Sequence, residues 1–600
     1  MRIKLSMAAS ALALGLATAG TASAQDYGRI VTFGDSLSDN GNLYAATGNT
    51  TPTSPPYFQG RFSNGPVWVE LLGWTQARVG GSLTGSYNSA YGGSRTDNAV
   101  PFPTGMRQQI TNYLGSGGTF DGDDLVTIWG GANNIFQGLP TASVQADPFG
   151  YIAGVSATAA ADMGFMINQV SDAGAGTILV ANLPNLGITP QFAGGPAQGL
   201  ATHATNAFNA ALFAQVSAQA AANPSSNVIF MDVNRAFNVV AGAPGRFGFS
   251  NISAPCFNGV TVCATPDTYA YWDAVHPTAA GHRLIASVAT DYLYYLDYGA
   301  HSAVQAEIGV RARADGMDAV TGRLGYGEIA GRPGGLYIGG TYDQTELDAR
   351  GDVPGGDMDG TGLIVGAEGN LGDSMRAGAA FQVRTADADL GLVNFTAEGA
   401  SLDVYAGWRS GSVFVNAAAG YSWDQFEDIS RQTATPGIVA MSSTNGSSMG
   451  AKVEAGINFD MGGLAFIPRA GLSWVSTEVD GYVEENPFGA QHQVAGRSVD
   501  AVSAEAVLRV EGGGGPIGFW GEAGYRDVLS HDGDPVSVGI AGNTAQMLDL
   551  HVEDPDGGQA LLGAGLTTRW GVAEIGVGYR GRMGEAYNVH QALLEVSVEF

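Results

Sequence analysis

Apolar and polar residues alternate with a period of two along the C-terminal part of the chain, and this pattern restricts the fold more than any other feature. The chain ends on an alternating segment, Leu594–Phe600. The same alternation recurs over residues 402–408, 413–417, 453–459, 464–466 and 573–579. A period of two places apolar side chains on one face of a strand and polar side chains on the other. The C-terminal part is therefore predicted to be β-sheet with one apolar and one polar surface.

The connections between these segments predict the number of strands. Tight turns fall near residues 370–374, 409–412, 460–463, 511–516 and 568–572. Longer segments rich in Asp, Gly, Ser and Thr lie near 343–361, 385–400, 424–448, 476–500, 526–557 and 582–589. Five short and six long connections join twelve strands. Because short turns on one side and long loops on the other are typical of outer-membrane barrels, we predict a 12-stranded transmembrane β-barrel over residues 334–600. A soluble β-sandwich is the alternative.

The first residues indicate export from the cytoplasm. Two basic residues precede an apolar run over residues 7–19, and the small residues at 22–24 suit a signal peptidase. We therefore predict a signal peptide over residues 1–24, which a sandwich alone would not explain. The run is too short for a spanning helix and no later apolar stretch is long enough, which excludes a helical inner-membrane protein.

Composition indicates a folded chain that does not bind nucleic acid. Hydrophobic residues make up 45% of the sequence and charged residues 14%, which excludes a disordered chain. The formal net charge is −29, from 27 Lys and Arg against 56 Asp and Glu. Such a charge repels a polyphosphate backbone and argues against nucleic acid as a partner.

The two cysteines, Cys256 and Cys263, lie in a Gly- and Pro-containing segment of this exported chain. Their spacing fits one disulfide that closes a short loop, and two free thiols are the alternative. A metal site is disfavoured because two cysteines cannot complete a tetrahedral ligand set, and no histidine pair is spaced to help.

The N-terminal half alternates short β-branched segments with Ala-rich helical ones. Buried strands are predicted over residues 30–33, 125–129, 177–181 and 228–231, and helices over 155–174 and 199–222. This alternation predicts a three-layer α/β domain over residues 25–298 with a mostly parallel sheet. Functional sites of such folds form at the C-terminal ends of the strands.

Three residues of this half suit nucleophilic catalysis. Ser36 directly follows the first predicted strand, but a serine needs a base within hydrogen-bond reach. Asp273 and His276 lie three residues apart in a predicted turn. The carboxylate can hold the Nδ1–H of the imidazole there, which leaves Nε2 to accept the serine proton. Each short motif alone more often has only a structural role.

Six segments, taken together, resemble the GDSL esterases and lipases, also called SGNH hydrolases. They are FGDSLSD at 33–39, GRFSNGPVW at 60–68, NSAYGGS at 88–94, GANN at 131–134, LPNLG at 183–187, and Asp273 with His276. The resemblance implies a flavodoxin-like α/β/α fold with Ser36 as nucleophile, His276 as base and Asp273 as its partner. It also implies ester hydrolysis without a metal or cofactor.

The same resemblance implies an oxyanion hole. Its donors are the backbone N–H groups of Ser36 and Gly93 and the side-chain amide of Asn133, where an Asx-type turn is the alternative role. We expect glycine at position 93 because a side chain would block a close backbone approach. Two departures put local geometry in doubt: Asn134 stands where the family often has Asp, and Ser94 where Ala is usual.

The segment between the two halves is polar. Residues 300–325 lack long apolar runs, and about 20 helical residues span roughly 30 Å. We therefore predict that residues 299–333 form a linker and a helix that spans the pore, with an ordinary surface linker as the alternative. The second half, which closes on Phe600, resembles the translocation barrel of autotransporters. The order of the two parts is similar to that of the autotransporter GDSL esterases.

These observations predict a serine esterase or lipase on the surface of a bacterial cell, anchored in the outer membrane by its own barrel. Expected partners are an ester substrate, outer-membrane lipid and, from the resemblance, the barrel-assembly machinery, and the protein is expected to be a monomer. One alternative is a non-catalytic, adhesin-like passenger, which should lack a member of the triad or oxyanion set. A solute porin is another, disfavoured if residues 300–325 fill the lumen.

Overall fold

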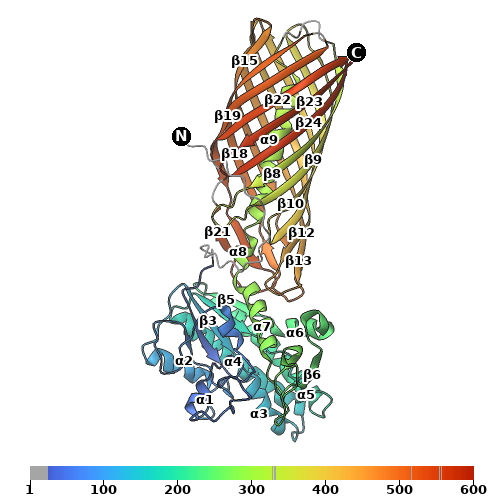
Figure 1. The fold of residues 1–600 in the computed structure, drawn as a ribbon. Coiled ribbons are helices and arrows are strands. Elements are labelled where there is room, and N and C mark those ends of the chain that lie inside the picture. The colour runs from blue at the N-terminus through green and yellow to red at the C-terminus, as the bar shows by residue number, and fades with distance from the viewer. Residues whose placement is uncertain are drawn as a thin grey trace.

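The computed structural model describes residues 25–327, 329, 333–514, 516–552, 555 and 557–599 (Figure 1). The predicted signal peptide, residues 1–24, and Phe600 lie outside the described residues. An α/β domain occupies one end of the molecule and a β-barrel the other, with helices α8 (Tyr295–Gly299) and α9 (Ser302–Arg323) between them in the chain. In the part that the structure describes, no helix is long and apolar enough to cross a membrane.

The α/β domain is built on a five-stranded parallel sheet with the order β2-β1-β3-β4-β5. Its strands are β1 (Arg29–Gly34), β2 (Tyr87–Asn88), β3 (Asp124–Trp129), β4 (Thr177–Ala181) and β5 (Asn227–Met231). Strands β1, β3 and β5 are buried along their whole length, because helices cover both faces of a parallel sheet. The predicted α/β class is confirmed.

Seven helices of this domain and a second small sheet surround the central strands over the described residues. The helices are α1 (Asn42–Ala46), α2 (Met106–Gly115), α3 (Ala132–Ala142), α4 (Pro148–Asp172), α5 (Gln198–Ala222), α6 (Val233–Gly242) and α7 (Ala279–Leu293). The small sheet pairs β6 (Asn251–Pro255) with β7 (Tyr269–Tyr271). The helices predicted over residues 155–174 and 199–222 correspond to α4 and α5.

The barrel is a closed antiparallel sheet. Its long strands are β8 (Gly335–Leu347), β9 (Gly356–Asn370), β10 (Met375–Asp389), β11 (Val393–Ser410), β12 (Val413–Gln432), β13 (Val439–Ile457), β15 (Leu464–Val479), β18 (Arg497–Gly514), β19 (Ile517–Gly533), β22 (Gln559–Trp570), β23 (Ala573–Met583) and β24 (Tyr587–Glu599). The sheet has thirteen described strands, but the short β14 (Phe459–Met461) only continues β13, so the barrel has the predicted twelve. Pairing of β24 with β8 closes it.

Strand ends on the side of the α/β domain differ from the prediction. The long loop expected over 385–400 is mostly strand, because only residues 390–392 separate β10 from β11. Strands β11, β12 and β13 contain 18, 20 and 19 residues, whereas about 9–11 residues suffice to cross a bilayer. These strands continue toward the α/β domain (Figure 1). Their polar outer segments therefore resemble loops in sequence although they remain paired.

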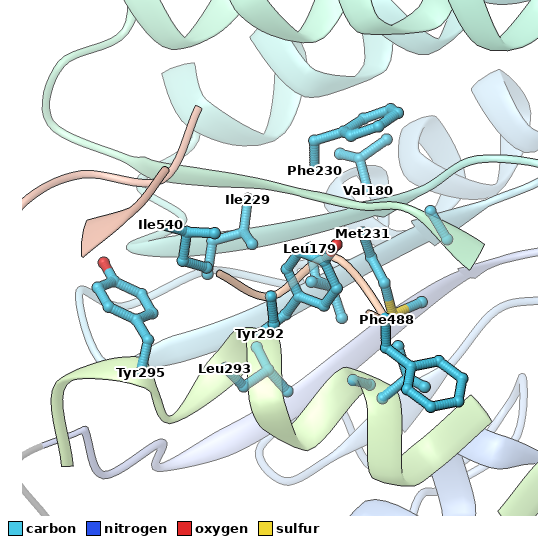
Figure 2. Close-up of a cluster of buried hydrophobic side chains, with 14 of the residues drawn as sticks. Leu179, Val180, Ile229, Phe230, Met231, Tyr292, Leu293, Tyr295, Phe488 and Ile540 are labelled. Atoms are coloured by element: carbon cyan, nitrogen blue, oxygen red, sulfur yellow. The ribbon is translucent and has the colours of Figure 1, made fainter. Parts of the chain in front are cut away.

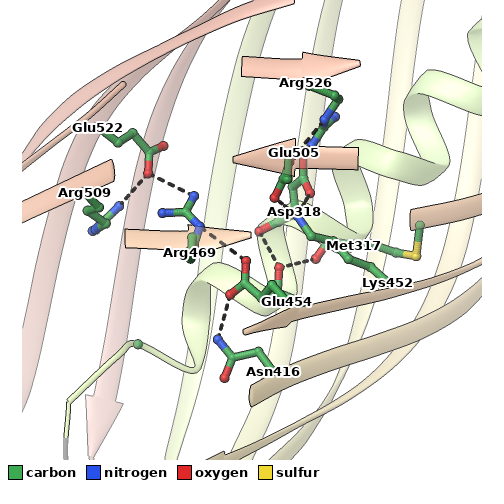
Figure 3. Close-up of polar contacts among 12 residues, drawn as sticks. Met317, Asp318, Asn416, Lys452, Glu454, Arg469, Glu505, Arg509, Glu522 and Arg526 are labelled. Atoms are coloured by element: carbon green, nitrogen blue, oxygen red, sulfur yellow. Dashed lines mark hydrogen bonds and ion pairs between the residues drawn. The ribbon is translucent and has the colours of Figure 1, made fainter. Parts of the chain in front are cut away.

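Helix α9 runs inside the barrel and is held there by ion pairs (Figure 1). Asp318 of the helix contacts both Lys452 and Arg526 of the barrel wall, and Glu505 pairs with the same two cations (Figure 3). Each negative charge thus lies between two positive ones. This arrangement explains why the helix is polar: its surroundings are charged side chains rather than lipid or an apolar core.

A second ionic network lies next to the first in the lumen (Figure 3). Arg469 reaches Glu454 and Glu522, each at 3.3 Å, and Arg509 also approaches Glu522 at 3.3 Å. The Asn416 amide donates to Glu454 over 2.7 Å. Together with α9, the side chains of Glu454, Arg469 and Glu522 line a cavity of about 180 Å³ inside the barrel.

Loops of the barrel extend to the α/β domain and cover an edge of its sheet. They carry a small sheet of β16 (Tyr482–Val483), β17 (His492–Val494), β20 (Val536–Ile540) and β21 (Leu548–Leu550). Strand β5 is an edge strand, and the side chain of Asn543 binds both the N–H and the carbonyl of Phe230, at 3.1 and 2.7 Å. The Thr544 hydroxyl donates to the Val228 carbonyl over 2.6 Å. Backbone groups that would otherwise form an open edge are thereby satisfied.

The two parts also share one apolar core. Phe488 and Ile540 of the barrel loops are buried in the same cluster as Tyr292 and Leu293 of α7 and the residues of β4 and β5 (Figure 2). Phe488 is only 1% exposed and its ring lies edge-on to Phe247 of the α/β domain, 5.5 Å between centroids. The α/β domain is therefore packed against the barrel rather than attached by a flexible tether.

This shared core predicts that Phe488→Ala destabilises the α/β domain. Truncating a buried Phe costs about 3–5 kcal/mol, because apolar contacts are lost and a cavity remains. We expect a lower denaturation midpoint for the near-UV circular dichroism of the full-length protein in detergent. The matched control is Phe519→Ala, since Phe519 is 45% exposed on the barrel exterior. Equal midpoints for the Phe488 variant and the unmodified protein would contradict this docking.

Candidate active site

The predicted site residues follow neighbouring strands of the parallel sheet. Ser36 lies two residues after the end of β1, Gly93 follows β2, and Asn133 is the second residue of α3, after β3. The C-terminal ends of parallel strands meet at one edge of a sheet. Residues separated by almost one hundred positions are therefore brought together.

Ser36, His276 and Asp273 form a continuous chain of hydrogen bonds. The Ser36 hydroxyl lies 2.8 Å from Nε2 of His276, and Nδ1 of His276 lies 2.7 Å from Oδ2 of Asp273. Oδ1 of Asp273 also accepts the backbone N–H groups of Val275 and His276, at 2.9 and 2.8 Å. The turn before α7 therefore fixes the carboxylate against the imidazole that it orients.

The electrostatics of these groups favour an ionised Asp273 and a basic His276. Burial disfavours the charge of Asp273, but attraction to His276 and the hydrogen bonds to its carboxylate outweigh burial, so the pKa of Asp273 lies below its ordinary value. Burial also opposes the charge of His276, yet Asp273 and, more weakly, Asp35 raise the pKa of His276 above its ordinary value. Burial raises the pKa of Asp35 itself to about 6.

The segment 60–68 supports the loop that carries His276. The Ser63 hydroxyl donates to the carbonyl of Pro277 over 3.0 Å, and Asn64 accepts the backbone N–H of Ala279 over 2.7 Å. The ring of Phe62 lies 5.0 Å from the imidazole of His276, centroid to centroid. This part of the sequence motif thus sets the position of the histidine.

Ser36, Gly93 and Asn133, the three predicted oxyanion donors, line one cavity. In the described part of the chain, the backbone N–H groups of Ser36 and Gly93 have no acceptor. The Asn133 amide donates to the Ser94 carbonyl at 2.9 Å and approaches Asp35 at a longer 3.4 Å. One amide hydrogen of Asn133 is thus only weakly held.

The requirement for glycine at position 93 has a different origin from the one expected. A Cβ added there would lie 3.3 Å from Pro103, which is tight but not blocked. The backbone φ of Gly93 is +79°, a left-handed conformation that favours glycine. The conformation of the turn, rather than close approach alone, therefore explains this residue.

Asp39 organises the turn that carries Gly93. Its carboxylate accepts backbone N–H groups from Gly41 at 2.7 Å, Asn42 at 2.6 Å, Leu43 at 3.2 Å and Gly92 at 2.8 Å. Burial is the largest influence on the Asp39 carboxyl and raises its pKa to about 6. The sequence motif contains Asp39, but no local pattern indicates that this residue of the loop after β1 binds the N–H of Gly92.

The two departures from the family pattern are both satisfied structurally. Asn134 accepts the Thr96 backbone N–H at 2.9 Å and donates to the Thr96 hydroxyl at 3.0 Å. The Ser94 hydroxyl donates to the Thr104 carbonyl over 2.8 Å and accepts from Gln109 over 3.1 Å. Both side chains hold neighbouring loops and leave the groups around Ser36 in place.

An apolar cavity opens beside these polar groups. It has a volume of about 370 Å³ and is lined by Ser36, Gly93, Asn133 and His276 on its polar side. Its apolar lining includes Phe136, Leu183, Leu186, Phe237, Val275 and Ile285. The cavity therefore combines a hydroxyl and several hydrogen-bond donors with room for a hydrocarbon group.

Two further features lie close to the site but outside the cavity lining. Cys256 and Cys263 are joined by a disulfide, which closes the loop after β6. The Tyr57 hydroxyl donates to Oδ2 of Asp273 over 2.7 Å, a contact that the sequence did not predict. Tyr57 follows a proline-rich segment that indicates only a turn, so no sequence signal pointed to it.

Comparison with known proteins confirms the resemblances of both halves. Residues 30–289 match the model of the GDSL-like lipases/acylhydrolases, and residues 336–580 match the model of the autotransporter β-domain. Esterase EstA of Pseudomonas aeruginosa is 28% identical over 556 residues, which cover 80% of this chain and 81% of that protein.

Another relative is similar only to the first half. The phosphatidylcholine-sterol acyltransferase of Aeromonas hydrophila is 31% identical over 241 residues, which cover 39% of this chain and 66% of that protein. Among solved structures, the translocator domain of the autotransporter NalP from Neisseria meningitidis aligns with a TM-score of 0.40 and 17% identity, over 50% of this chain and 96% of that one. The chain therefore joins a GDSL-like lipase/acylhydrolase domain, that of a carboxylic ester hydrolase, to an autotransporter β-domain of the outer membrane.

Proposed function

We propose that this protein is a serine esterase of the cell surface that hydrolyses carboxylic esters with Ser36, His276 and Asp273 as its catalytic triad. The observation that carries the proposal is the unbroken line of hydrogen bonds from the Ser36 hydroxyl through both imidazole nitrogens to Asp273. Each bond lies in the range expected of a nucleophile, its base and the group that orients the base.

In the acylation step, the Ser36 oxygen attacks the ester carbonyl carbon while its proton passes to Nε2 of His276. The Nδ1–H of the imidazole donates to the Asp273 carboxylate, so the proton stays on Nδ1, and the carboxylate stabilises the imidazolium that forms. Collapse of the tetrahedral intermediate breaks the ester C–O bond, and His276 returns its proton to the departing alcohol. A water molecule then repeats the sequence on the acyl-enzyme and releases the carboxylic acid.

The oxyanion of the tetrahedral intermediate is held by three donors in this proposal. The N–H groups of Ser36 and Gly93 are available, and the weakly held hydrogen of Asn133 turns from Asp35 toward the oxyanion. The two backbone donors are fixed before the reaction, so they stabilise developing charge without reorganisation. The apolar cavity beside them supports an acyl or aryl group as the part of the substrate that enters.

We further propose that the barrel displays the esterase outside the cell. Residues 25–298 form the passenger, 299–333 the linker and pore-spanning helix, and 334–600 the barrel. The position of α9 in the lumen supports this division, since the chain then passes through the pore on its way to the passenger. All proposed catalytic groups come from one chain, which supports a monomer. By family resemblance, the barrel-assembly machinery inserts it.

Ser36→Ala should abolish ester turnover because it removes the nucleophile. The measurement is hydrolysis of p-nitrophenyl esters by purified protein, and of a charged ester that does not cross the outer membrane by intact cells. The variant should reach the membrane in normal amount with a folded barrel. Turnover by the Ser36 variant at the original rate would refute the triad. For the unmodified protein, hydrolysis of the charged ester that appears only after cell lysis would refute surface display.

The rate should fall on the acid side as His276 becomes protonated. Only the neutral imidazole accepts the serine proton, and the pKa of His276 is raised, chiefly by Asp273 against the opposing effect of burial. The acid limb of kcat/KM should therefore have its midpoint above the ordinary histidine value of about 6.5. A pH profile from 5 to 9 measures it, and a midpoint clearly below that value would contradict the proposed electrostatics.

Asn133→Ala should lower kcat by about 10²–10³-fold, the typical loss of one oxyanion donor, with a smaller effect on KM. The reason is that the amide binds the charge of the intermediate more strongly than the neutral ester. Steady-state kinetics on a soluble p-nitrophenyl ester test this. Asn168→Ala is the control, because Asn168 hydrogen-bonds to Asp172 of α4 and to Asn223 at the end of α5 and does not line the cavity beside Ser36. A kcat that stays within twofold would remove Asn133 from the oxyanion hole.

A further inference from the structure

We propose that Tyr57 is a positioning residue of the active site, which holds the Asp273 carboxylate in the orientation that His276 requires. This inference rests on the proposed function, in which Asp273 and His276 belong to the triad. Tyr57 lies more than two hundred residues from Asp273 in the chain, yet its hydroxyl donates to Oδ2 of Asp273 over 2.7 Å.

The phenol completes the hydrogen bonding of the carboxylate. Oδ1 accepts the backbone N–H groups of Val275 and His276, and Oδ2 accepts Nδ1–H of His276 and the hydroxyl of Tyr57. A carboxylate offers about four acceptor sites, so all of them are used. Without the phenol, Oδ2 would depend on the imidazole alone and the carboxylate would be less restrained.

Aromatic neighbours hold the Tyr57 ring on three sides. Trp272, next to Asp273 in the chain, lies edge-on at 6.2 Å between centroids. Phe257 lies edge-on at 5.7 Å, and Phe62 at 6.1 Å. Edge-to-face pairs of this kind favour one ring orientation. The hydroxyl is thus aimed at Asp273 by packing as well as by the hydrogen bond.

The disulfide loop provides one of these neighbours. Phe257 follows Cys256 directly, stacks on Trp272 at 5.8 Å and donates its N–H to the Trp272 carbonyl over 2.6 Å. The Cys256 N–H donates to the carbonyl of Tyr271 over 3.0 Å. The short closed loop is therefore fastened to the strand that leads to Asp273, and it supports Tyr57 from behind.

Tyr57 acts through Asp273 and not on the substrate. It does not line the cavity beside Ser36, whereas Phe62 and His276 do. Its burial and the charge of Asp273 raise the pKa of the phenol, which keeps the hydroxyl protonated as a donor. Loss of the hydroxyl should accordingly change kcat and the acid limb of the pH profile while KM stays nearly constant.

The direction of the pH shift follows from the charges around the imidazole. Asp273 and Asp35 face His276, and His282 lies nearby but is neutral, because burial and the charge of His276 lower its pKa to about 3. Removing the phenol leaves more negative charge on Asp273 for the imidazolium to interact with. The pKa of His276 should therefore rise, and the acid limb of kcat/KM should move to higher pH.

The test is Tyr57→Phe in the full-length protein, which keeps the ring and removes only the hydroxyl. We expect kcat for p-nitrophenyl butyrate to fall about ten- to a hundredfold, the loss typical of one hydrogen bond to a charged group. The control is Tyr113→Phe, which loses a hydrogen bond to the Thr119 carbonyl in the core of the same domain. That variant should retain the original pH profile.

A second variant tests the donor directly. Difluorotyrosine at position 57 keeps the ring and the hydroxyl but donates more strongly, so the acid limb should move to lower pH, opposite to Tyr57→Phe. If neither variant shifts the limb, the inference is wrong, and if Tyr57→Phe does not fold, the fluorinated protein decides. Ser36→Ala is assayed in parallel. Its inactivity beside an unshifted Tyr57 series would overturn only the role of Tyr57, whereas its full activity would overturn the esterase mechanism.

Discussion

Lipid offers no hydrogen bonds, so a sheet that crosses it has to close on itself, and most features of this molecule follow from that closure. Pairing of the last strand with β8 satisfies the backbone of the wall and leaves an enclosed polar lumen. That lumen can accept a charged helix, and the ion pairs of Asp318 hold α9 within it. The helix in turn places the α/β domain over one mouth of the barrel, where long strands and loops reach its edge.

Carboxylates also organise the candidate site in the α/β domain, because each accepts hydrogen bonds from several donors. Asp39 gathers N–H groups from two loops and fixes the turn that contains Gly93. Asp273 accepts two backbone N–H groups besides the imidazole and a phenol. A carboxylate whose acceptor positions are all hydrogen-bonded is held in one orientation, since any rotation leaves a donor without a partner. In the proposed mechanism, Asp273 and the turn with Gly93 are therefore in place before substrate binds.

The sequence predicts the parts of this structure that local pattern determines. Period-two alternation predicts the strand number of the barrel. Short motifs at strand ends predict Ser36, Gly93, Asn133 and the turn with His276 as site residues, and the fold brings them together around one cavity. Tyr57 could not be found in this way, because its contact with Asp273 depends on how two distant loops fold over each other. The extended ends of β11, β12 and β13 were also missed, since paired strands exposed to water carry the same polar residues as loops.

The covered edge of β5 has a consequence for replacing the α/β domain by another protein on this barrel. Asn543 and Thr544 hydrogen-bond to the backbone of β5, and Phe488 is buried in the core shared with the α/β domain. Without that domain, these groups would lose their partners. A foreign protein fused in place of the esterase would leave an apolar ring and loose loops at the mouth of the pore. A fusion of another protein to this barrel would therefore require that the loops which contact the α/β domain be shortened or redesigned as well.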